Sequence, residues 1–335
     1  MKEEKRTVIC GTGHYLPPQI VTNFDLEKII NTSDEWIRQR TGIVQRHYGT
    51  PGVGSSDLAT EAAKLAIKDA GIDKSEIDFI IAATLSPDYY FPGIGVLVGS
   101  KLGLNGIGAL DVRNQCSGFI YALSVADQYI RNGTYQKILL VAAEVQSSNL
   151  DHSDEGRDMA VLFGDGAGAV ILEANSENDG RGILTTKLFS DGQYACELWM
   201  EKPSPKDKPT FSPGLLEEKK YYPRMNGRNV FKHAIEKMPQ AVWASLKEVS
   251  LTVNDIDHLI PHQANDRISL MVAQKLNIPV NKVIRNIHRV GNTTAASIPI
   301  ALDEAVKEKR IKTGDLVALT AFGSGFTWAA ALLRW

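Results

Sequence analysis

The sequence contains few cysteines, no long apolar run and no strong excess of either charge, and each absence excludes a class of protein. Its three cysteines, Cys10, Cys116 and Cys196, lie far apart and form no CxxC pair. An odd, scattered set excludes a disulfide framework and a structural zinc site, and it indicates a reducing compartment. No run of 18 apolar residues occurs, so no membrane span is predicted. A net charge of −2 argues against a general nucleic-acid binder.

We expect no targeting signal at the start of the chain. Residues 1–6 are mostly charged, and the apolar piece that follows at 8–10 is too short for the core of a signal peptide. We therefore expect a soluble, cytoplasmic protein. Its 335 residues, of which 43% are hydrophobic and 23% charged, suffice for one large domain or two moderate ones.

Strand-like and helix-like segments alternate along the whole chain, which is typical of an α/β fold. Residues 56–70 repeat apolar side chains at helical spacing, and Gly71 follows as a terminator. Continuous apolar runs at 78–84, 137–143 and 167–172 predict strands that are buried on both faces.

The second half of the chain repeats the pattern of the first half. Three pairs of segments recur in the same order and at nearly constant spacing: 76–80 with 255–259, 100–104 with 274–278, and 137–143 with 315–321. Such repetition indicates a duplicated α/β unit. The polar, turn-rich stretch 175–180 predicts the boundary, so we divide the chain into halves 1–175 and 176–335.

One segment, 202–223, breaks the alternation. It holds five of the 14 prolines and has little periodicity, which is typical of a long surface loop or flap. A disordered insertion without a role is the alternative. The apolar side chains of Leu215, Leu216, Tyr221 and Tyr222 favour a flap that covers an apolar surface.

Cys116 lies between an apolar segment and a helical pattern that begins near Phe119. A thiol at a strand-to-helix turn is close to unpaired helix N–H groups and to the positive end of the helix dipole. Both favour the thiolate, which is the nucleophilic form. From the local sequence alone, a buried and inert core cysteine is the stronger interpretation.

Two downstream residues change that interpretation. His262 follows an apolar strand, and Asn292 lies in a turn before a helix start that is rich in small residues. Ligands bind at the carboxyl ends of strands in open α/β sheets, and the duplication places Cys116 and the segment near 290 at one end of the molecule. Taken singly, His262 could be an ordinary satisfied histidine and Asn292 a turn former.

Together these segments resemble the three signatures of the β-ketoacyl-[acyl-carrier-protein] synthase III family, which are condensing enzymes of the thiolase superfamily. The signatures are at 111–119, 261–265 and 291–299, and further matching stretches are at 32–37, 40–43, 162–169 and 321–328. The resemblance spans nearly the full length, from Val8 to Trp335. It implies a five-layered αβαβα fold built from two duplicated halves.

The resemblance also implies a mechanism. Cys116 would take an acyl group from acyl-CoA, and His262 and Asn292 would stabilise the enolate formed when malonyl-acyl carrier protein loses CO2. An oxyanion hole would come from the backbone N–H of Cys116 and a glycine-rich turn. That turn consists of Gly323, Ser324 and Gly325. No metal and no redox cofactor would be needed.

Binding residues are implied by the same matching. Trp36 and Arg157 would grip the adenine of CoA, and Arg40 would lie near its phosphates. Arg267 would meet the acidic carrier protein, with an ordinary solvated arginine as the alternative. Phe91 matches a residue that the partner subunit contributes to the acyl pocket, which implies a homodimer. A core phenylalanine is the alternative there.

Three departures from the family pattern concern the acyl group. Arg113, Asn114 and Gln115 precede the nucleophile where small residues are usual. Ser324 replaces the middle glycine of the turn, where a left-handed backbone would be strained. The segment 202–223 is longer than the family's loop. These departures indicate a primer other than acetyl.

The most direct interpretation is therefore an enzyme that initiates dissociated fatty-acid synthesis. A relative in secondary metabolism that condenses or transfers longer acyl chains is the main alternative. An inactive homologue is disfavoured because Cys116, His262 and Asn292 are all present. A degradative thiolase is disfavoured because the last cysteine is Cys196, far from the C-terminal turn.

Overall fold

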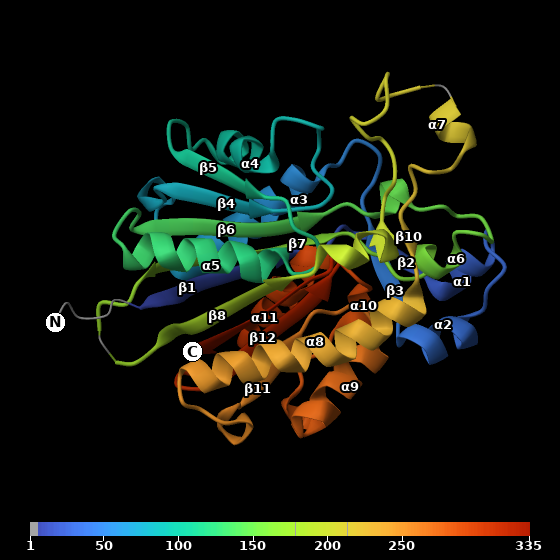
Figure 1. Cartoon of the computed structure of the whole chain (residues 1–335). Coiled ribbons are helices and arrows are strands. Elements are labelled where there is room, and N and C mark those ends of the chain that lie inside the picture. The colour runs from blue at the N-terminus through green and yellow to red at the C-terminus, as the bar shows by residue number, and fades with distance from the viewer. Residues whose placement is uncertain (1–5, 178, 213) are drawn as a thin grey trace.

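The computed structural model describes residues 6–177, 179–212 and 214–335. Two sequence interpretations involve residues outside this range. Residues 1–5 belong to the segment used to assess a targeting signal, and Pro213 belongs to the loop 202–223. The described chain forms five layers in the order helix, sheet, helix, sheet, helix (Figure 1). The predicted thiolase-like αβαβα architecture is confirmed.

The first sheet comes from the first half of the chain. Two parallel pairs are followed by two antiparallel pairs, and the sheet contains the buried strands predicted from the apolar runs at 78–84, 137–143 and 167–172. Its strands, in spatial order, are β5 (Gly108–Val112), β4 (Phe79–Ala83), β6 (Lys137–Glu144), β7 (Gly166–Ala174) and β1 (Thr7–Tyr15).

The second sheet repeats this arrangement with the second half of the chain. One parallel pair is followed by two antiparallel pairs, and an isolated parallel bridge between Leu259 and Val283 lies where β5 lies in the first sheet. Its strands are β11 (His258–Pro261), β12 (Leu316–Gly323), β13 (Thr327–Arg334) and β8 (Gly182–Ser190). Two small pairs add β2 (Gln19–Thr22) with β3 (Gln45–Tyr48), and β9 (Leu198–Trp199) with β10 (Arg224–Met225).

The local details of the repeat also agree between the halves. Helix α4 (Ile94–Leu102) ends at Gly103 with φ 72°, and α9 (Asp266–Leu276) ends at Asn277 with φ 56°. A left-handed residue closes both helices, and asparagine is the side chain that tolerates this conformation best after glycine. The division of the chain into halves 1–175 and 176–335 stays a prediction.

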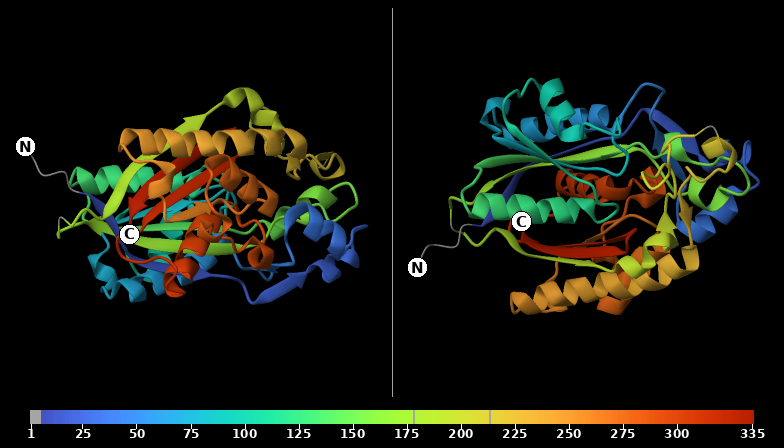
Figure 2. Two further views of the ribbon diagram at one scale, coloured as in Figure 1. Left: turned by 90° about the horizontal axis from the view of Figure 1, so that it is seen from below. Right: turned by 45° about the horizontal axis from the view of Figure 1, so that its top comes forward.

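Two helices lie between the sheets and form the central layer (Figure 2, right). The largest apolar cluster is here, where α5 (Gly118–Arg131) and α11 (Ser297–Lys307) contact both sheets. The outer layers are α3 (Ser55–Ala70) with α4 on the first sheet, and α8 (Gly227–Glu248) with α9 on the second. The helix predicted at 56–70 is confirmed as α3, and Gly71 closes it with φ 66°.

Shorter helices and the irregular segments gather beside one end of the sheets. These helices are α1 (Asn23–Glu27), α2 (Asp34–Thr41), α6 (Arg157–Ala160), α7 (Gly214–Glu217) and α10 (Ile287–Val290). The loop 202–223 carries α7 and projects from the body of the molecule (Figure 1). The rings of Tyr221 and Tyr222 pack against each other at 4.1 Å between centroids, and Phe211 is 61% exposed. A covering role for this loop stays a prediction.

Among the described residues, every helix is too short or too polar to cross a membrane.

Candidate active site

Cys116 lies in the turn between the end of β5 at Val112 and the start of α5 at Gly118, as predicted. The turn is closed by a 2.7 Å hydrogen bond from the Gly118 N–H to the Gln115 carbonyl. The start of α5 packs against the segment that follows Asn292, because a Cβ added to Gly118 would lie 3.4 Å from the Cβ of Ala295.

The thiolate expected for Cys116 is contradicted by the burial of its side chain. Cys116 is almost fully buried, and burial raises the pKa of its thiol to about 12, with the nearby carboxylate of Glu144 adding to the rise. Removal of the thiolate from water outweighs the helix dipole, which acts only at the first turn. The Cys116 thiol is therefore neutral at physiological pH.

This raised pKa predicts how Cys116 reacts with iodoacetamide. Only the thiolate reacts, so the alkylation rate should rise by about tenfold per pH unit and show no plateau below about pH 11. Peptide-resolved mass spectrometry would follow each thiol separately. Cys10, whose pKa burial also raises to about 12, is the matched control, and the exposed Cys196 reports accessible thiol. A plateau for Cys116 near neutral pH would contradict this charge assignment.

The glycine-rich turn lies directly against the nucleophile. A Cβ added to Gly323, the last residue of β12, would lie 2.9 Å from the backbone nitrogen of Cys116. Only glycine permits this approach. The strain considered for Ser324 does not arise, because the left-handed φ of 132° falls on Gly325. The Ser324 hydroxyl instead donates to the carbonyl of Leu198.

His262 follows β11 and is buried, as a neutral imidazole. Burial lowers its pKa to about 3. Its Nδ1 lies 2.7 Å from the hydroxyl of Ser297, and that hydroxyl oxygen also accepts the Gln263 N–H at 3.3 Å. A Ser297 hydroxyl that donates to Nδ1 leaves the proton on Nε2. Nε2 is buried and has no partner among the described residues, so it is free to donate to a ligand.

Asn292 is held at both its backbone and its side chain. Its N–H donates to the Leu162 carbonyl at 2.9 Å, and its own carbonyl accepts from Gly164 at 3.0 Å. The side-chain oxygen accepts the Thr294 N–H at 2.9 Å. This bond occupies the amide oxygen, so the amide N–H groups are the ones left to donate.

One short segment joins these three residues. The 3₁₀ turn Thr294–Ala296 and the start of α11 contact the turn after Cys116 through Ala295, His262 through Ser297, and Asn292 through Thr294. Residues that lie up to 176 positions apart in the chain (292 − 116) are thus brought to one place. The arrangement combines a thiol, two neutral hydrogen-bond donors and a backbone turn.

The three residues expected to bind CoA also lie together. The guanidinium carbons of Arg40 and Arg157 are 4.8 and 4.5 Å from the ring centre of Trp36. Arg267 lies close to this group, because Asn265 accepts its backbone N–H at 2.9 Å and donates to the Arg40 carbonyl at 2.8 Å. Two guanidinium groups therefore lie over the ring of Trp36, near the start of α9, while the guanidinium of Arg267 lies over the ring of Phe231.

Phe91 does not belong to the core of this chain. It is 81% exposed, and its neighbours Tyr89 and Tyr90 are 60% and 62% exposed. The interpretation of Phe91 as an ordinary core residue is therefore wrong.

Three residues of the site were missed from the sequence. Ser297 orients His262, Thr294 orients Asn292, and Glu144 is a fully buried carboxylate whose charge raises the pKa of the Cys116 thiol. Glu144 follows the apolar run 137–143 without a break, and a charge at the end of a buried strand was a usable signal. Small polar residues such as Ser297 and Thr294 carry no comparable signal.

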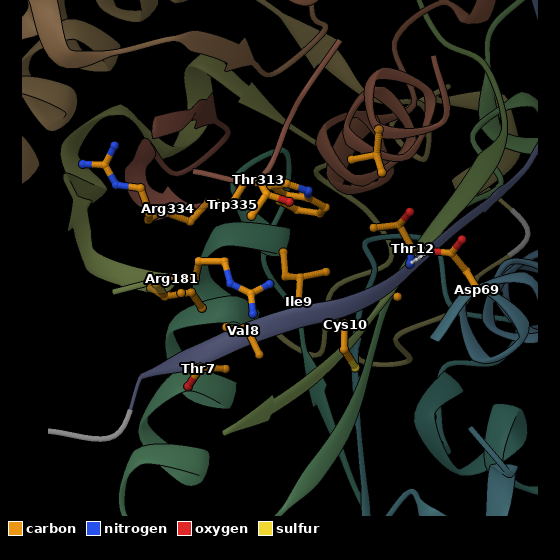
Figure 3. A pocket seen from close by; sticks show the side chains of 15 residues that line it. Thr7, Val8, Ile9, Cys10, Thr12, Asp69, Arg181, Thr313, Arg334 and Trp335 are labelled. Carbon is orange, nitrogen blue, oxygen red and sulfur yellow. Dashed lines mark hydrogen bonds between the residues drawn. The ribbon is translucent and has the colours of Figure 1, made fainter. Parts of the chain in front are cut away.

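A cavity of about 380 Å³ lies at the other end of the molecule (Figure 3). It is bordered by β1 and by the end of β13, with Arg181, Cys10 and Trp335 in its lining. The opposite end of β13 is at the site, where the hydroxyl of Thr327 lies 2.8 Å from that of Ser117. This cavity is thus separated from Cys116 by the length of a strand.

The chain matches two models of known families. Residues 110–192 match "3-Oxoacyl-[acyl-carrier-protein (ACP)] synthase III" and residues 246–335 match its C-terminal model. A β-ketoacyl-[acyl-carrier-protein] synthase III of Bradyrhizobium diazoefficiens is 46% identical over 334 residues, covering 98% of this chain and 99% of the relative.

Solved structures are similar to this chain over nearly its whole length. The 3-oxoacyl-[acyl-carrier-protein] synthase III of Aquifex aeolicus is 44% identical with a TM-score of 0.90, covering 98% of this chain and 100% of that one. A priming β-ketosynthase of the R1128 polyketide biosynthetic pathway is 31% identical with a TM-score of 0.91, covering 99% of this chain and 97% of that one.

Proposed function

The chain belongs to the 3-oxoacyl-[acyl-carrier-protein] synthase III family, and from this premise we propose how its residues divide the work of the reaction. The enzyme condenses an acyl-CoA primer with malonyl-acyl carrier protein, with loss of CO2, to give 3-oxoacyl-acyl carrier protein. This is the initiating condensation of type II fatty-acid synthesis. The observation that carries the division of labour is that the segment 294–297 contacts His262, Asn292 and, through Gly118, the start of the helix that follows Cys116.

The first half-reaction is acyl transfer to Cys116. Its sulfur attacks the thioester carbonyl of acyl-CoA, the bond to the CoA sulfur breaks, and the thiol proton leaves with CoA. Negative charge develops on the carbonyl oxygen in between. Backbone N–H groups of Cys116 and of the turn formed by Gly323, Ser324 and Gly325 would stabilise that charge. The support is the close approach of Gly323 to the Cys116 nitrogen.

The second half-reaction is decarboxylation and condensation. The malonyl group loses CO2, and its thioester oxygen becomes an enolate that accepts hydrogen bonds from His262 Nε2 and the Asn292 amide. The enolate carbon then attacks the acyl group on Cys116, and the sulfur leaves and regains a proton from solvent. A buried, neutral imidazole supports this role, since it can donate without itself becoming charged.

Substrate binding is assigned to the group around Trp36. Arg157 and Trp36 would enclose the adenine of CoA, Arg40 would meet its phosphates, and Arg267 would meet the acidic carrier protein. The support is that both guanidinium groups already stack on Trp36 and that Arg267 adjoins them through Asn265. We expect no metal or redox cofactor, because both half-reactions are acyl transfers between thioesters.

A homodimer is part of the same proposal. Phe91 would enter the acyl pocket of the partner subunit. The support is an exposed aromatic run, Tyr89 to Phe91, that a second copy would cover.

Intact-mass spectrometry tests the function directly. The protein would be incubated with acetyl- through lauroyl-CoA, and malonyl-acyl carrier protein would then be added. We expect a mass increase equal to the acyl group, followed by its loss as 3-oxoacyl-acyl carrier protein appears. From the residues that precede Cys116, we expect a chain longer than acetyl to load fastest. Acylation without condensation would instead favour a relative that transfers acyl groups in secondary metabolism.

A further inference from the structure

Glu144 is a buried carboxylate that the reaction as described does not use. It ends β6, is fully inaccessible to solvent, and accepts hydrogen bonds from the Leu85 N–H at 3.2 Å, the Ser86 hydroxyl at 2.6 Å and the Gln146 amide at 3.0 Å. So many donors around one carboxylate hold it rigidly and favour its charged form. Burial raises the pKa of Glu144, and these donors oppose the rise.

Thr294 belongs to a turn that packs against the strand carrying this carboxylate. Strand β6 packs against the turn Thr294–Ala296. The Thr294 hydroxyl is buried and has no hydrogen-bond partner among the described residues, and the Thr294 side chain lowers the pKa of the Glu144 carboxyl. A buried hydroxyl beside a carboxylate has one favourable arrangement, in which the hydroxyl donates.

The backbone of Thr294 has a second unusual feature. Its φ is 45°, in the left-handed region that a β-branched residue rarely adopts. In that conformation its N–H donates to the Asn292 side-chain oxygen at 2.9 Å. The strained residue is thus the one that fixes which way the Asn292 amide points.

We propose that Glu144 and Thr294 are a positioning pair for the decarboxylation step: Glu144 holds the Thr294 hydroxyl, and Thr294 in turn holds the Asn292 amide with its N–H groups directed at the malonyl thioester. The inference rests on the role proposed for Asn292. Neither residue touches substrate in this scheme, and both act through Asn292.

Glu144 also acts on Cys116, and in the opposite sense. Its negative charge adds to the rise in the pKa of the thiol. Removal of the charge should therefore make Cys116 easier to deprotonate, while loss of the anchor should weaken decarboxylation. A purely structural residue would affect both steps in the same direction.

The test measures the two steps separately in Glu144→Gln. We expect malonyl-acyl carrier protein decarboxylation to fall by about tenfold to a hundredfold. Acylation of Cys116 by acyl-CoA should stay within about threefold, and iodoacetamide should alkylate Cys116 faster at neutral pH. An equal loss in both steps would overturn the proposal.

A double-mutant cycle identifies the route of the effect. If Glu144 acts through Asn292, Glu144→Gln should change decarboxylation by less than about twofold in an Asn292→Ala background. Additive losses would overturn the proposal. If Asn292→Ala alone left decarboxylation intact, the role of Asn292 itself would fail, which is a different result.

Two substitutions at Thr294 keep the proposal testable if Glu144→Gln does not fold. Thr294→Val keeps the branched shape and removes the hydroxyl, and Thr294→Ser keeps the hydroxyl. We expect Thr294→Val to slow decarboxylation by about tenfold and Thr294→Ser to keep most of the rate of the unsubstituted protein. Equal rates for the two variants would overturn the proposal.

Asp303 supplies a matched control. It is another fully buried carboxylate, held by the Thr12 hydroxyl at 2.6 Å and by His14 Nδ1 at 2.5 Å, and it takes no part in the arrangement around Asn292. Asp303→Asn should lower stability without changing the ratio of the two rates. A shift in that ratio as large as the one for Glu144→Gln would show that any buried carboxylate gives this effect, and would overturn the proposal.

Discussion

Replacing Cys116 with alanine is expected to abolish formation of the acyl-enzyme. The sulfur is the only atom in this scheme that can carry the acyl group between the two half-reactions, and no other residue of the segment 113–118 offers a thiol. Overall condensation should fall by roughly 10³- to 10⁶-fold, as when a nucleophile is removed from other acyl-transfer enzymes. Intact-mass spectrometry after incubation with acyl-CoA would show the unmodified mass.

The serine variant sharpens this experiment. Cys116→Ser keeps nearly the same size, so binding of CoA near Trp36 should persist while acylation is lost. Cys10→Ser is the control, because Cys10 is a buried thiol that lines the distant cavity. In the Cys10→Ser protein, Cys116 should be acylated as in the unsubstituted protein. Stoichiometric acylation of the Cys116→Ser or Cys116→Ala protein would mean that the nucleophile is another residue.

The second large effect is expected at His262 and Asn292. Replacing either with alanine removes a donor to the enolate oxygen, so decarboxylation of malonyl-acyl carrier protein should fall by about 10²- to 10³-fold. Acylation of Cys116 should be largely unchanged, because its oxyanion is stabilised by backbone N–H groups. Release of CO2 and the mass of the acyl-enzyme report the two steps independently.

A conservative replacement separates the chemistry at His262 from its packing. His262→Gln retains an N–H donor of similar reach, so it should keep more decarboxylation activity than His262→Ala. Gln263, the next residue, is buried, and its amide donates to the Pro261 carbonyl at 2.6 Å. Replacing Gln263 therefore controls for disturbed packing beside His262. If His262→Ala slowed acylation as much as decarboxylation, the separation of roles between Cys116 and His262 would be wrong.

Much of the architecture followed from local patterns. The apolar runs at 78–84, 137–143 and 167–172 predicted β4, β6 and β7, because strands covered on both faces need apolar side chains at every position. The helical spacing at 56–70 predicted α3. The repeated segments predicted that the second sheet would resemble the first, since like sequences in like order form like units.

The charge of the nucleophile could not be obtained in this way. The helix that follows Cys116 is visible in the sequence, and its dipole favours a thiolate. The depth of burial is not visible, because it depends on the end of β12 and on the turn at Ala295, which come from distant parts of the chain. Desolvation acts on the whole thiol, whereas the dipole acts over one turn, so burial prevails.

The sequence by itself thus determined the fold class and the duplicated pattern, and it singled out Cys116, His262 and Asn292 as the candidate site residues, because these depend on local periodicity and on motifs that are short and contiguous. Only the tertiary structure decided how those residues are oriented. The tautomer of His262 depends on Ser297, and the direction of the Asn292 amide depends on Thr294. Such hydrogen bonds join groups whose approach is set by the packing of α11 between two sheets, and no local pattern records that packing.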